Sequence, residues 1–424
     1  MRRLALILLG WVALIDADAA DFRRTPSQTT EAELGRAGAL DGVWQWTLPD
    51  TPNGLRPTQS WHATGSSPDG DIYVAAMDHV TNAALYRLDW RVGKLQFVGD
   101  ARSASELVHN WMPGETAQKF HTRPLWHRGK IYVATMDRST LDDAYLTRRG
   151  FHWYAHDPVL NTFTDLSASE PGGVAVTHGN VVTIAPDPVR NIIYGASVPT
   201  GEIYRYDIGR GRTDVLGRPS SFDQPYAYTG RIMWVDSGGR LYFTASSSKN
   251  PSVYGHVHYY DPETGFGERK DWILQEEQAL EVGECLANGK QCIFSDDKGH
   301  VYRFDDEGPS WSYLGQIETG QQLKYIWMFD VTRDMSKVYA ATSSSPQPSD
   351  FTSLYEFDLT TGKTERLCTL AKLGPALRDL HIHTGYDAWD PAGRFYFASF
   401  NGRPDQSVIV TRIDPARLKD ALNK

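Results

Sequence analysis

A short pattern of polar and apolar positions that ends in aspartate recurs along the chain. Seven copies run from an apolar residue to an aromatic or aliphatic residue and then to Asp89, Asp157, Asp207, Asp261, Asp305, Asp358 and Asp414. Upstream of each copy lies a second apolar segment, and these segments are centred on Tyr73, Tyr132, Tyr194, Tyr242, Phe294, Tyr339 and Tyr396. The aromatic anchors recur every 54 residues or so, about the length of one propeller blade with its loops.

Units of this kind predict four short antiparallel strands each, and seven such units around an axis form a seven-bladed β-propeller. Residues 43–47 alternate as a strand ahead of the first unit, whereas residues 415–424 carry no strand pattern. We therefore predict an all-β propeller of four-stranded antiparallel blades whose ring is closed by the N-terminal strand. Two β-sandwiches are the alternative, but their strands would not repeat one Asp-terminated pattern seven times.

The first twenty residues have the features of a secretory signal peptide. A basic start at Arg2 and Arg3 precedes an apolar run over residues 4–15, and small residues lead up to Ala20. The run is shorter than the roughly 20 residues that a bilayer crossing needs, although an uncleaved membrane anchor is the alternative. We expect residues 1–20 to be a signal peptide and residues 21–424 a single propeller domain, secreted or periplasmic and not membrane-bound.

The amino-acid composition limits the fold class and the kinds of molecule that the protein can bind. Aromatic residues make up 12% of the 424 residues, which is typical of many short strands. The net charge of −9 argues against nucleic-acid binding, which normally uses a basic surface. We expect a monomer.

Candidate functional residues lie where the innermost strand of each blade begins, at the mouth of the central channel. Eleven positions before the aromatic anchor, three blades carry His62, His121 and Arg231. In the other blades the same count falls on apolar or small residues, with further ionisable or aromatic residues one to five positions away, among them His178, Glu284, Tyr325, Trp327, His381 and His383. A channel mouth that binds an anion explains this concentration of basic groups, and a water-filled channel without activity is the alternative.

Two loops extend this surface. His79 follows the second strand of the first blade, and Arg138 follows the second strand of the next blade at the start of a long basic insertion over residues 137–150. The fifth blade has a much shorter connection between its second and third strands than the second blade has. A high basic rim opposite a low one predicts an open-sided groove, suited to a long substrate, although a solvated loop is the simpler interpretation.

A separate group of residues could bind a metal ion. Cys285, Cys292 and His300 lie in the fifth blade, while His256 and His258 lie in the blade before it. In an exported protein the two cysteines could form a cross-strand disulfide. Alternatively, His258, Cys285, Cys292 and His300 could bind a structural zinc ion that joins the two blades.

The secretory start, the seven blades, residues 114–124 (Gly-Glu-Thr-Ala-Gln-Lys-Phe-His-Thr-Arg-Pro) and the pair Gly230-Arg231 resemble the secreted propeller ulvan lyases, which cleave a sulfated, uronate-containing polysaccharide. The resemblance implies His121 as the active-site histidine and Arg231 as the group that neutralises the uronate. It also implies a catalytic tyrosine, for which Tyr228 is the first choice and Tyr226 and Tyr194 are alternatives. His178 is a second candidate for the base.

These residue types suit β-elimination. Removing the proton at C5 of a uronate requires a neutralised carboxylate, which Arg231 can bind in a bidentate way. A neutral imidazole can accept the proton, and it or a tyrosine can protonate the leaving oxygen. Substrate-binding roles fall to His62, His79, Arg138, Trp327 and His383. The expected partner is an anionic polysaccharide.

Two further interpretations remain. The chain resembles the oligogalacturonate lyases more distantly, but Arg378 stands where their manganese-binding Gln-x-x-His-x-His stretch has glutamine, ahead of His381 and His383. Because arginine cannot ligate a cation, that metal site is not expected. A propeller that binds carbohydrate or protein without catalysis is the alternative function.

Overall fold

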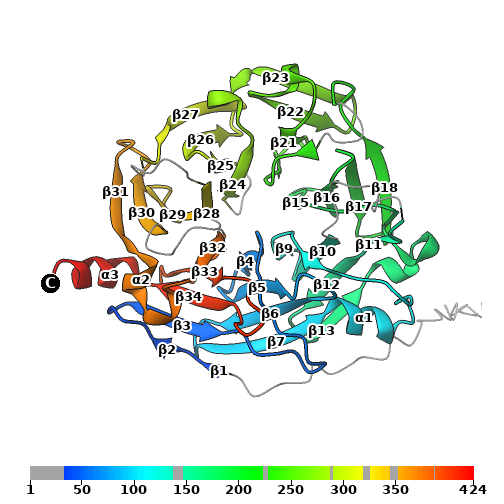
Figure 1. Cartoon of the computed structure of the whole chain (residues 1–424). Helices are drawn as coiled ribbons and strands as arrows, with labels where there is room; N and C mark the ends of the chain where they lie inside the picture. Colours follow the sequence, from blue (N-terminus) through cyan, green and yellow to red (C-terminus); the bar gives the residue numbers. More distant parts are fainter. Residues whose placement is uncertain are drawn as a thin grey trace, which may run out of the picture.

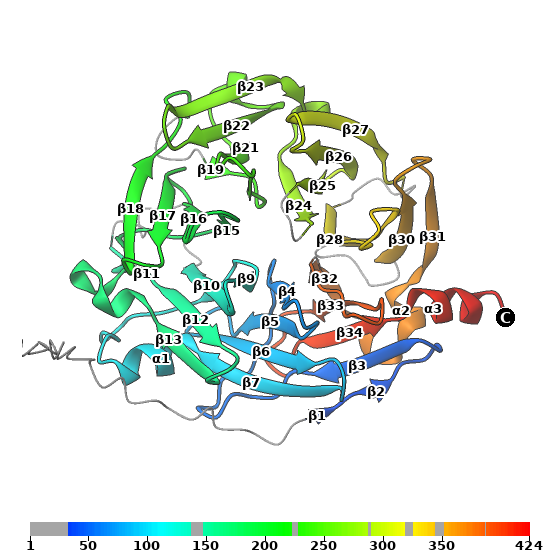
Figure 2. The same cartoon turned by 180° about the vertical axis from the view of Figure 1, so that it is seen from behind.

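The computed structural model describes residues 33–136, 147–222, 228–286, 290–318, 325–343, 352–385 and 387–424. Its strands form seven antiparallel sheets around a central axis, as Figure 1 and the reverse view in Figure 2 show. The predicted seven-bladed β-propeller is therefore confirmed. The helices in the described part of the chain are too short or too polar to cross a membrane.

Each aromatic anchor of the repeat lies in the second strand of a blade, and each Asp-terminated copy forms or ends the third strand. The innermost strands are β4 (Thr64–Ser66), β8 (Lys119–Phe120) with β9 (Leu125–His127), β15 (Thr183–Pro186), β19 (Tyr228–Thr229) with β20 (Trp234–Val235), β24 (Leu280–Cys285), β28 (Tyr325–Val331) and β32 (His381–Thr384). The second strands are β5 (Ile72–Met77), β10 (Lys130–Met136), β16 (Ile192–Ala196), β21 (Leu241–Ser247), β25 (Gln291–Asp296), β29 (Lys337–Ser343) and β33 (Phe395–Phe400).

The outer half of each blade follows the same order. The third strands are β6 (Ala83–Asp89), β12 (Trp153–Asp157), β17 (Ile203–Asp207), β22 (His256–Asp261), β26 (His300–Asp305), β30 (Ser353–Asp358) and β34 (Ile409–Ile413). The outermost strands are β7 (Lys94–Asp100), β13 (Thr162–Asp165), β18 (Arg212–Gly217), β23 (Gly265–Ile273), β27 (Ser310–Gln316), β31 (Thr364–Thr369) and β3 (Val43–Thr47).

The N-terminal strand closes the ring as expected. Strand β3 pairs antiparallel with β34 and so supplies the outermost strand of the last blade. Two short strands extend this closure: β2 (Arg36–Ala37) pairs with β3, and β1 (Glu33–Leu34) pairs with β7 of the first blade. The segment after Asp414 forms the helix α3 (Pro415–Leu422) instead of a strand.

The repeated aspartates have a structural role in the turn between the third and fourth strands. The Asp157 carboxylate accepts hydrogen bonds from the backbone N–H groups of Val159 and Leu160, each at 3.0 Å. Equivalent bonds are made at Asp89, Asp207, Asp261 and Asp358. An aspartate that binds the backbone two or three residues ahead imitates a turn, so the strand ends there.

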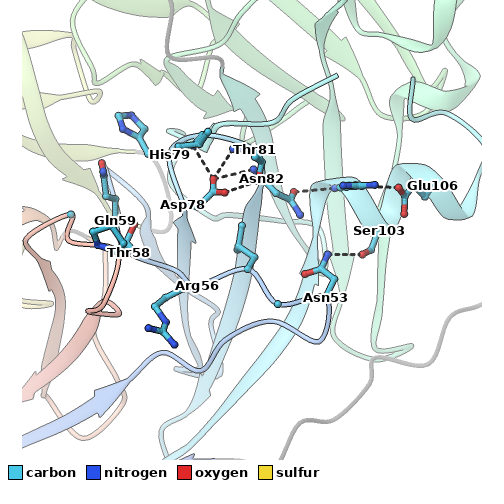
Figure 3. Close-up of a pocket in the computed structure, with 16 residues that line it drawn as sticks. Asn53, Arg56, Thr58, Gln59, Asp78, His79, Thr81, Asn82, Ser103 and Glu106 are labelled. Carbon is cyan, nitrogen blue, oxygen red and sulfur yellow. Dashed lines mark hydrogen bonds and ion pairs between the residues drawn. The ribbon is translucent and has the colours of Figure 1, made fainter. Parts of the chain in front are cut away.

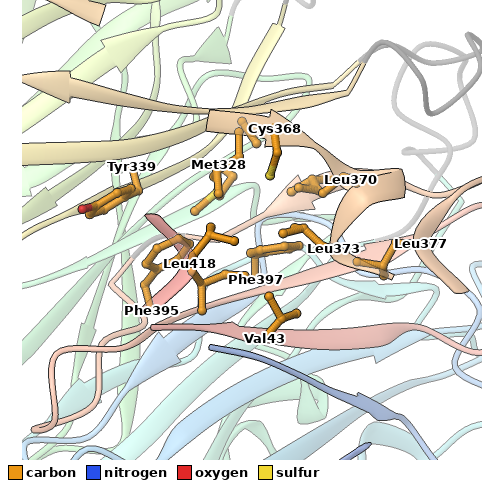
Figure 4. Close-up of a cluster of buried hydrophobic side chains, with 14 of the residues drawn as sticks. Val43, Met328, Tyr339, Cys368, Leu370, Leu373, Leu377, Phe395, Phe397 and Leu418 are labelled. Atoms are coloured by element: carbon orange, nitrogen blue, oxygen red, sulfur yellow. The ribbon is translucent and has the colours of Figure 1, made fainter. Parts of the chain in front are cut away.

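The core is divided among the blades. Seven clusters of buried apolar side chains each lie between two neighbouring blades, because every blade presents one face to each neighbour. Figure 4 shows the cluster between the sixth and seventh blades, where Met328 and Cys368 pack against Phe395, Phe397 and Val43. Cys368 is a buried free thiol.

Shorter elements decorate the ring. They are α1 (Ala101–Leu107), α2 (Leu370–Leu373), the paired strands β11 (Gly150–Phe151) and β14 (Val176–Thr177), and single turns of 3-10 helix at Ser167–Ser169, Pro171–Gly173, Pro251–Val253, Gln275–Glu277 and Pro375–Leu377.

Candidate functional site at the channel mouth

Six blades carry an ionisable or indole side chain on, or within three residues of, their innermost strands, and these residues are His62, His121, Arg231, Glu281, Trp327 and His383. Glu281, Trp327 and His383 occupy positions that the strand pairing skips, so they bulge out of β24, β28 and β32. A bulge re-aims a side chain away from the regular alternation. Main-chain bonds join neighbouring blades here, since His62 N–H donates to the His383 carbonyl at 3.0 Å.

The side chains contact one another in series. The ring of His62 lies 5.0 Å from that of His121 and 4.9 Å from that of Trp327, measured between centroids. Trp327 in turn lies 5.0 Å from His383 and beneath the guanidinium of Arg231, whose carbon is 4.6 Å from the ring centre. The structure thus brings together five residues that the sequence singled out. Their roles toward a substrate remain predictions.

The imidazole of His121 is held in one orientation. Its Nδ1 lies 2.9 Å from the backbone carbonyl oxygen of Val182, so Nδ1–H donates and Nε2 carries the lone pair. Burial lowers the pKa of His121 well below its usual value, and the charges of Lys119 and Arg231 act in the same direction. The ring is therefore neutral, as a general base must be.

Arg231 forms an ion pair with Glu281, a residue that the sequence pattern did not single out. Its Nη1 donates to Oε2 of Glu281, and the Ser246 hydroxyl donates to the other oxygen, Oε1, at 3.3 Å. Among the described residues only Nη1 has an acceptor, so Nε and Nη2 remain available. The side chain of Arg231 is 33% exposed and that of Glu281 only 6%, and burial raises the pKa of this carboxyl.

Sequence reasoning missed Glu281 because counting back from the anchor ignores the bulge. The count fell on Gly283, which pairs directly with the anchor Phe294 deep in the blade. Glu284, which the sequence also indicated, lies at the opposite opening. There it borders a cavity of about 540 Å³ to which all seven blades contribute. Glu281 lies two residues before the counted position, so a fixed count that allows neither for the bulge nor for a longer turn passes it by.

The remaining histidines of the cluster are buried. Burial and the neighbouring positive groups lower the pKa of both His62 and His383 well below the usual value. Both ring nitrogens of His383 lack a hydrogen-bond partner among the residues that the structure describes. A buried imidazole such as that of His383 is costly when its nitrogens have no partner, which is consistent with a site where a ligand supplies one.

A cavity of about 750 Å³ is lined mainly by residues of the first blade and the segment ahead of it (Figure 3). His79, a predicted substrate-binding residue, lines it beside Gln59, and its ring stacks 5.9 Å from that of Trp61. Trp61 lies 4.2 Å from His383 and so connects cavity and cluster. The other walls are mostly polar: Asn53, Arg56, Thr58, Asp78, Thr81, Asn82, Arg102, Ser103 and Glu106 line them.

Other predicted residues are placed elsewhere. His178 is exposed on the segment between the second and third blades, where its Nδ1 donates to the Arg148 carbonyl at 2.5 Å. Tyr194 is buried in the core between the third and fourth blades, so it is not a candidate for the catalytic tyrosine. The side chain of Tyr228, together with Tyr226 and Arg138, falls outside the described residues.

The predicted zinc site made of His258, Cys285, Cys292 and His300 is wrong. Cys285 and Cys292 are direct partners across β24 and β25, with Cα atoms 3.9 Å apart, and they form a disulfide. Disulfide sulfurs are not thiolates and do not bind zinc. His300 instead pairs with Asp296 at 2.7 Å. Of the four predicted ligands only His258 belongs to a group that could hold a metal, together with His256 and Glu268.

Comparisons with known proteins show the fold. No protein-family model matches the chain, and no curated protein matches it in sequence. Among solved structures, an oligogalacturonate lyase from Vibrio parahaemolyticus is similar at 8% identity and a TM-score of 0.54, covering 93% of this chain and 100% of that one.

Two further matches are of the same quality. An oligogalacturonate lyase in complex with manganese is 10% identical, with a TM-score of 0.53 and coverage of 93% and 99%. The WD40 repeats of RRP9 are 12% identical, with a TM-score of 0.54 and coverage of 90% and 100%. At these identities the likeness extends to the propeller fold, which enzymes and WD40 proteins share.

Proposed function

We propose that this chain is a secreted or periplasmic polysaccharide lyase that cleaves a uronate-containing, ulvan-like polysaccharide by β-elimination at the channel mouth. The observation that carries the proposal is the contact series of His62, His121, Trp327 and Arg231 at one end of the axis. Two similar structures are those of oligogalacturonate lyases, which suits the proposal.

The chemistry assigns a role to each group. The free N–H groups of Arg231 bind the uronate carboxylate and stabilise the charge that develops as the C5 proton leaves. Nε2 of His121 accepts that proton. The C4–O4 bond then breaks as the C4–C5 double bond forms, and an acid, for which Tyr228 is the candidate, protonates the leaving oxygen.

The adjoining cavity provides room for neighbouring sugars. Amide and hydroxyl groups such as those of Asn53, Gln59 and Thr81 are suited to sugar hydroxyls, while Arg56 and Arg102 are suited to sulfate or carboxylate groups. With an open cavity beside the cluster, a long chain can pass across the first blade. The protein acts as a monomer on an anionic polysaccharide, without nucleic acid or membrane.

The experiment is an absorbance assay near 235 nm, where the unsaturated product absorbs, with ulvan and polygalacturonate as substrates. We expect activity in the wild type and a loss of at least a hundredfold in His121→Gln and in Arg231→Gln. His178→Gln is the matched control and should retain activity, because His178 lies outside the cluster. Absence of product with every uronate polysaccharide, or equal activity in all variants, would exclude the proposal.

The second candidate function is a propeller that binds a polysaccharide but does not cleave it, and the state of the charged groups favours it. The Arg231 charge is balanced by Glu281, and the histidine rings are nearly inaccessible. If the protein only binds carbohydrate, the polysaccharide in the gel would retard it in affinity electrophoresis, and no absorbance at 235 nm would develop. Retention without product would therefore replace the lyase by the binder.

A further inference from the structure

A second group of chemically reactive side chains lies on the outer half of the fourth blade, away from the channel. His256 and His258 are two residues apart on β22, so their side chains leave the same face of the strand. Glu268 is the direct partner of His258 on the neighbouring strand β23. Strand register alone therefore brings two imidazoles and one carboxylate together.

The backbone fixes the tautomer of both rings. His256 Nδ1 lies 3.0 Å from the carbonyl oxygen of Tyr254, and His258 Nε2 lies 2.8 Å from that of Val253. A carbonyl oxygen only accepts, so these two nitrogens carry the hydrogens. The lone pairs consequently sit on His256 Nε2 and His258 Nδ1, which are buried and have no hydrogen-bond partner among the described residues.

Both lone pairs face the carboxylate. His256 Nε2 is 3.7 Å from one oxygen of Glu268, and His258 Nδ1 is 3.9 Å from the other. These separations are too long for hydrogen bonds. They are close to the spacing of about 3.4 Å between two ligands of one tetrahedral zinc ion at 2.0–2.1 Å.

The surroundings match those of a metal site. Histidines that bind metals usually donate their other ring N–H to a carbonyl or carboxylate, as both do here. The Ser221 hydroxyl donates to Glu268 at 3.1 Å and orients the carboxylate. Lys270 also approaches Glu268 at 3.3 Å, but its side chain is 75% exposed, so this ion pair is weak.

We propose that His256 Nε2, His258 Nδ1 and Glu268 bind one zinc-class divalent cation, with a water molecule as the fourth ligand. Imidazole and carboxylate ligands favour zinc or cobalt, whereas calcium and magnesium prefer sites made of oxygen atoms. The ion ties β22 to β23 and, through Glu268, holds Ser221. The site is independent of the proposed lyase activity.

The first measurement uses the wild-type full chain, freed of metal with a chelator. We expect one Zn²⁺ per chain with a dissociation constant of about 1 μM or below, and a higher melting temperature in zinc. Co²⁺ should give the visible absorption of a four-coordinate ion, and X-ray absorption of the zinc form should show two imidazoles and no sulfur. Zinc binding absent up to about 100 μM, or sulfur ligation, would overturn the proposal.

Variants locate the ion. Glu268→Gln and His256→Gln should each weaken zinc binding at least tenfold, while His300→Gln, a buried histidine of the next blade, should leave it unchanged. Melting temperatures in chelator separate ligand loss from misfolding. Zinc binding that is unaffected by both ligand variants, or abolished only by His300→Gln, would contradict the assignment.

Discussion

Arg231 and Glu281 set the charge of the channel mouth at the scale of single residues. The guanidinium has one exposed edge, and its other edge is neutralised by a carboxylate that is almost fully buried. Such a pair positions the arginine but reduces its attraction for an anion, since the nearby opposite charge offsets it. The affinity for a uronate therefore depends on Glu281 as well as on Arg231.

Replacing Glu281 tests this dependence. We expect Glu281→Gln to strengthen binding of a uronate oligosaccharide about three- to tenfold at low salt, because one negative charge beside Arg231 is removed. Ser246→Ala is the control, since it removes a hydrogen bond to the same carboxylate without changing its charge. Calorimetric titration of both variants would decide, and unchanged or weaker binding in Glu281→Gln would mean that Arg231 does not contact the anion.

At the scale of secondary-structure elements, the repeated aspartates determine where each third strand ends. Asp157 accepts two backbone N–H groups in the turn that follows β12. Asp305 occupies the same place in the repeat, but it bonds to the side chain of Gln291 in place of the turn backbone. A comparison of the two aspartates therefore distinguishes the stability that comes from the turn hydrogen bonds from any general effect of replacing an aspartate.

We expect Asp157→Ala to lower the free energy of unfolding by about 1–2 kcal/mol, because two backbone groups lose their partner. Asp305→Ala should cost less than about 1 kcal/mol, since its turn forms without it. Urea denaturation followed by circular dichroism would measure both. A loss in Asp305→Ala equal to that in Asp157→Ala would contradict the role of the turn bonds.

A polar network attaches the helix α1 to the second blade. His152 donates to Asp165 and to Glu115, each at 2.9 Å, while Ser105 of α1 donates to Asp165 at 2.7 Å. Burial alone would lower the pKa of His152, but the two carboxylates outweigh it and raise this pKa to about 9. In the folded protein the side chain of His152 is therefore a charged imidazolium at neutral pH.

The sign of the pH effect follows from this raised pKa. Below about pH 6.5 the ring is charged in both the folded and unfolded states, so the stabilisation is complete. It is lost as pH rises toward 9, where the folded ring gives up its proton. His152→Gln should remove this alkaline loss in denaturation curves, and His156→Gln should retain it, because burial lowers the pKa of His156 to about 4. Curves with equal alkaline slopes would refute the assignment.

The sequence predicts elements better than it predicts the site, for a physical reason. Strand order, the anchors and the closing strand follow from the alternation of apolar residues and from Asp turns, which act locally. The fixed count found His62, His121 and Arg231, and Trp327 and His383 were found only as neighbours of counted positions. Glu281, at the bulge of β24, was missed because no local pattern reveals a bulge. The choice between disulfide and zinc at Cys285 and Cys292 likewise depended on the strand register.

The whole molecule is a ring, so its stability depends on closure. The seven interfaces between blades bury similar clusters, and six of them join segments adjacent in sequence. The seventh joins the end of the chain to its beginning: Trp46 of β3 packs there and donates its indole N–H to the Gly93 carbonyl at 2.7 Å. Trp44, on the same strand, is 37% exposed.

The two tryptophans allow a matched test of ring closure. Trp46→Ala should lower the free energy of unfolding by about 3–5 kcal/mol, because a buried indole and its hydrogen bond are lost at the closing interface. Trp44→Ala should cost less than about 1 kcal/mol. Because each blade depends on both neighbours, the loss should appear as one cooperative transition at lower urea. A separate early transition would show instead that the last blade opens while the others remain folded, and the closing strand would then stabilise one blade and not the ring.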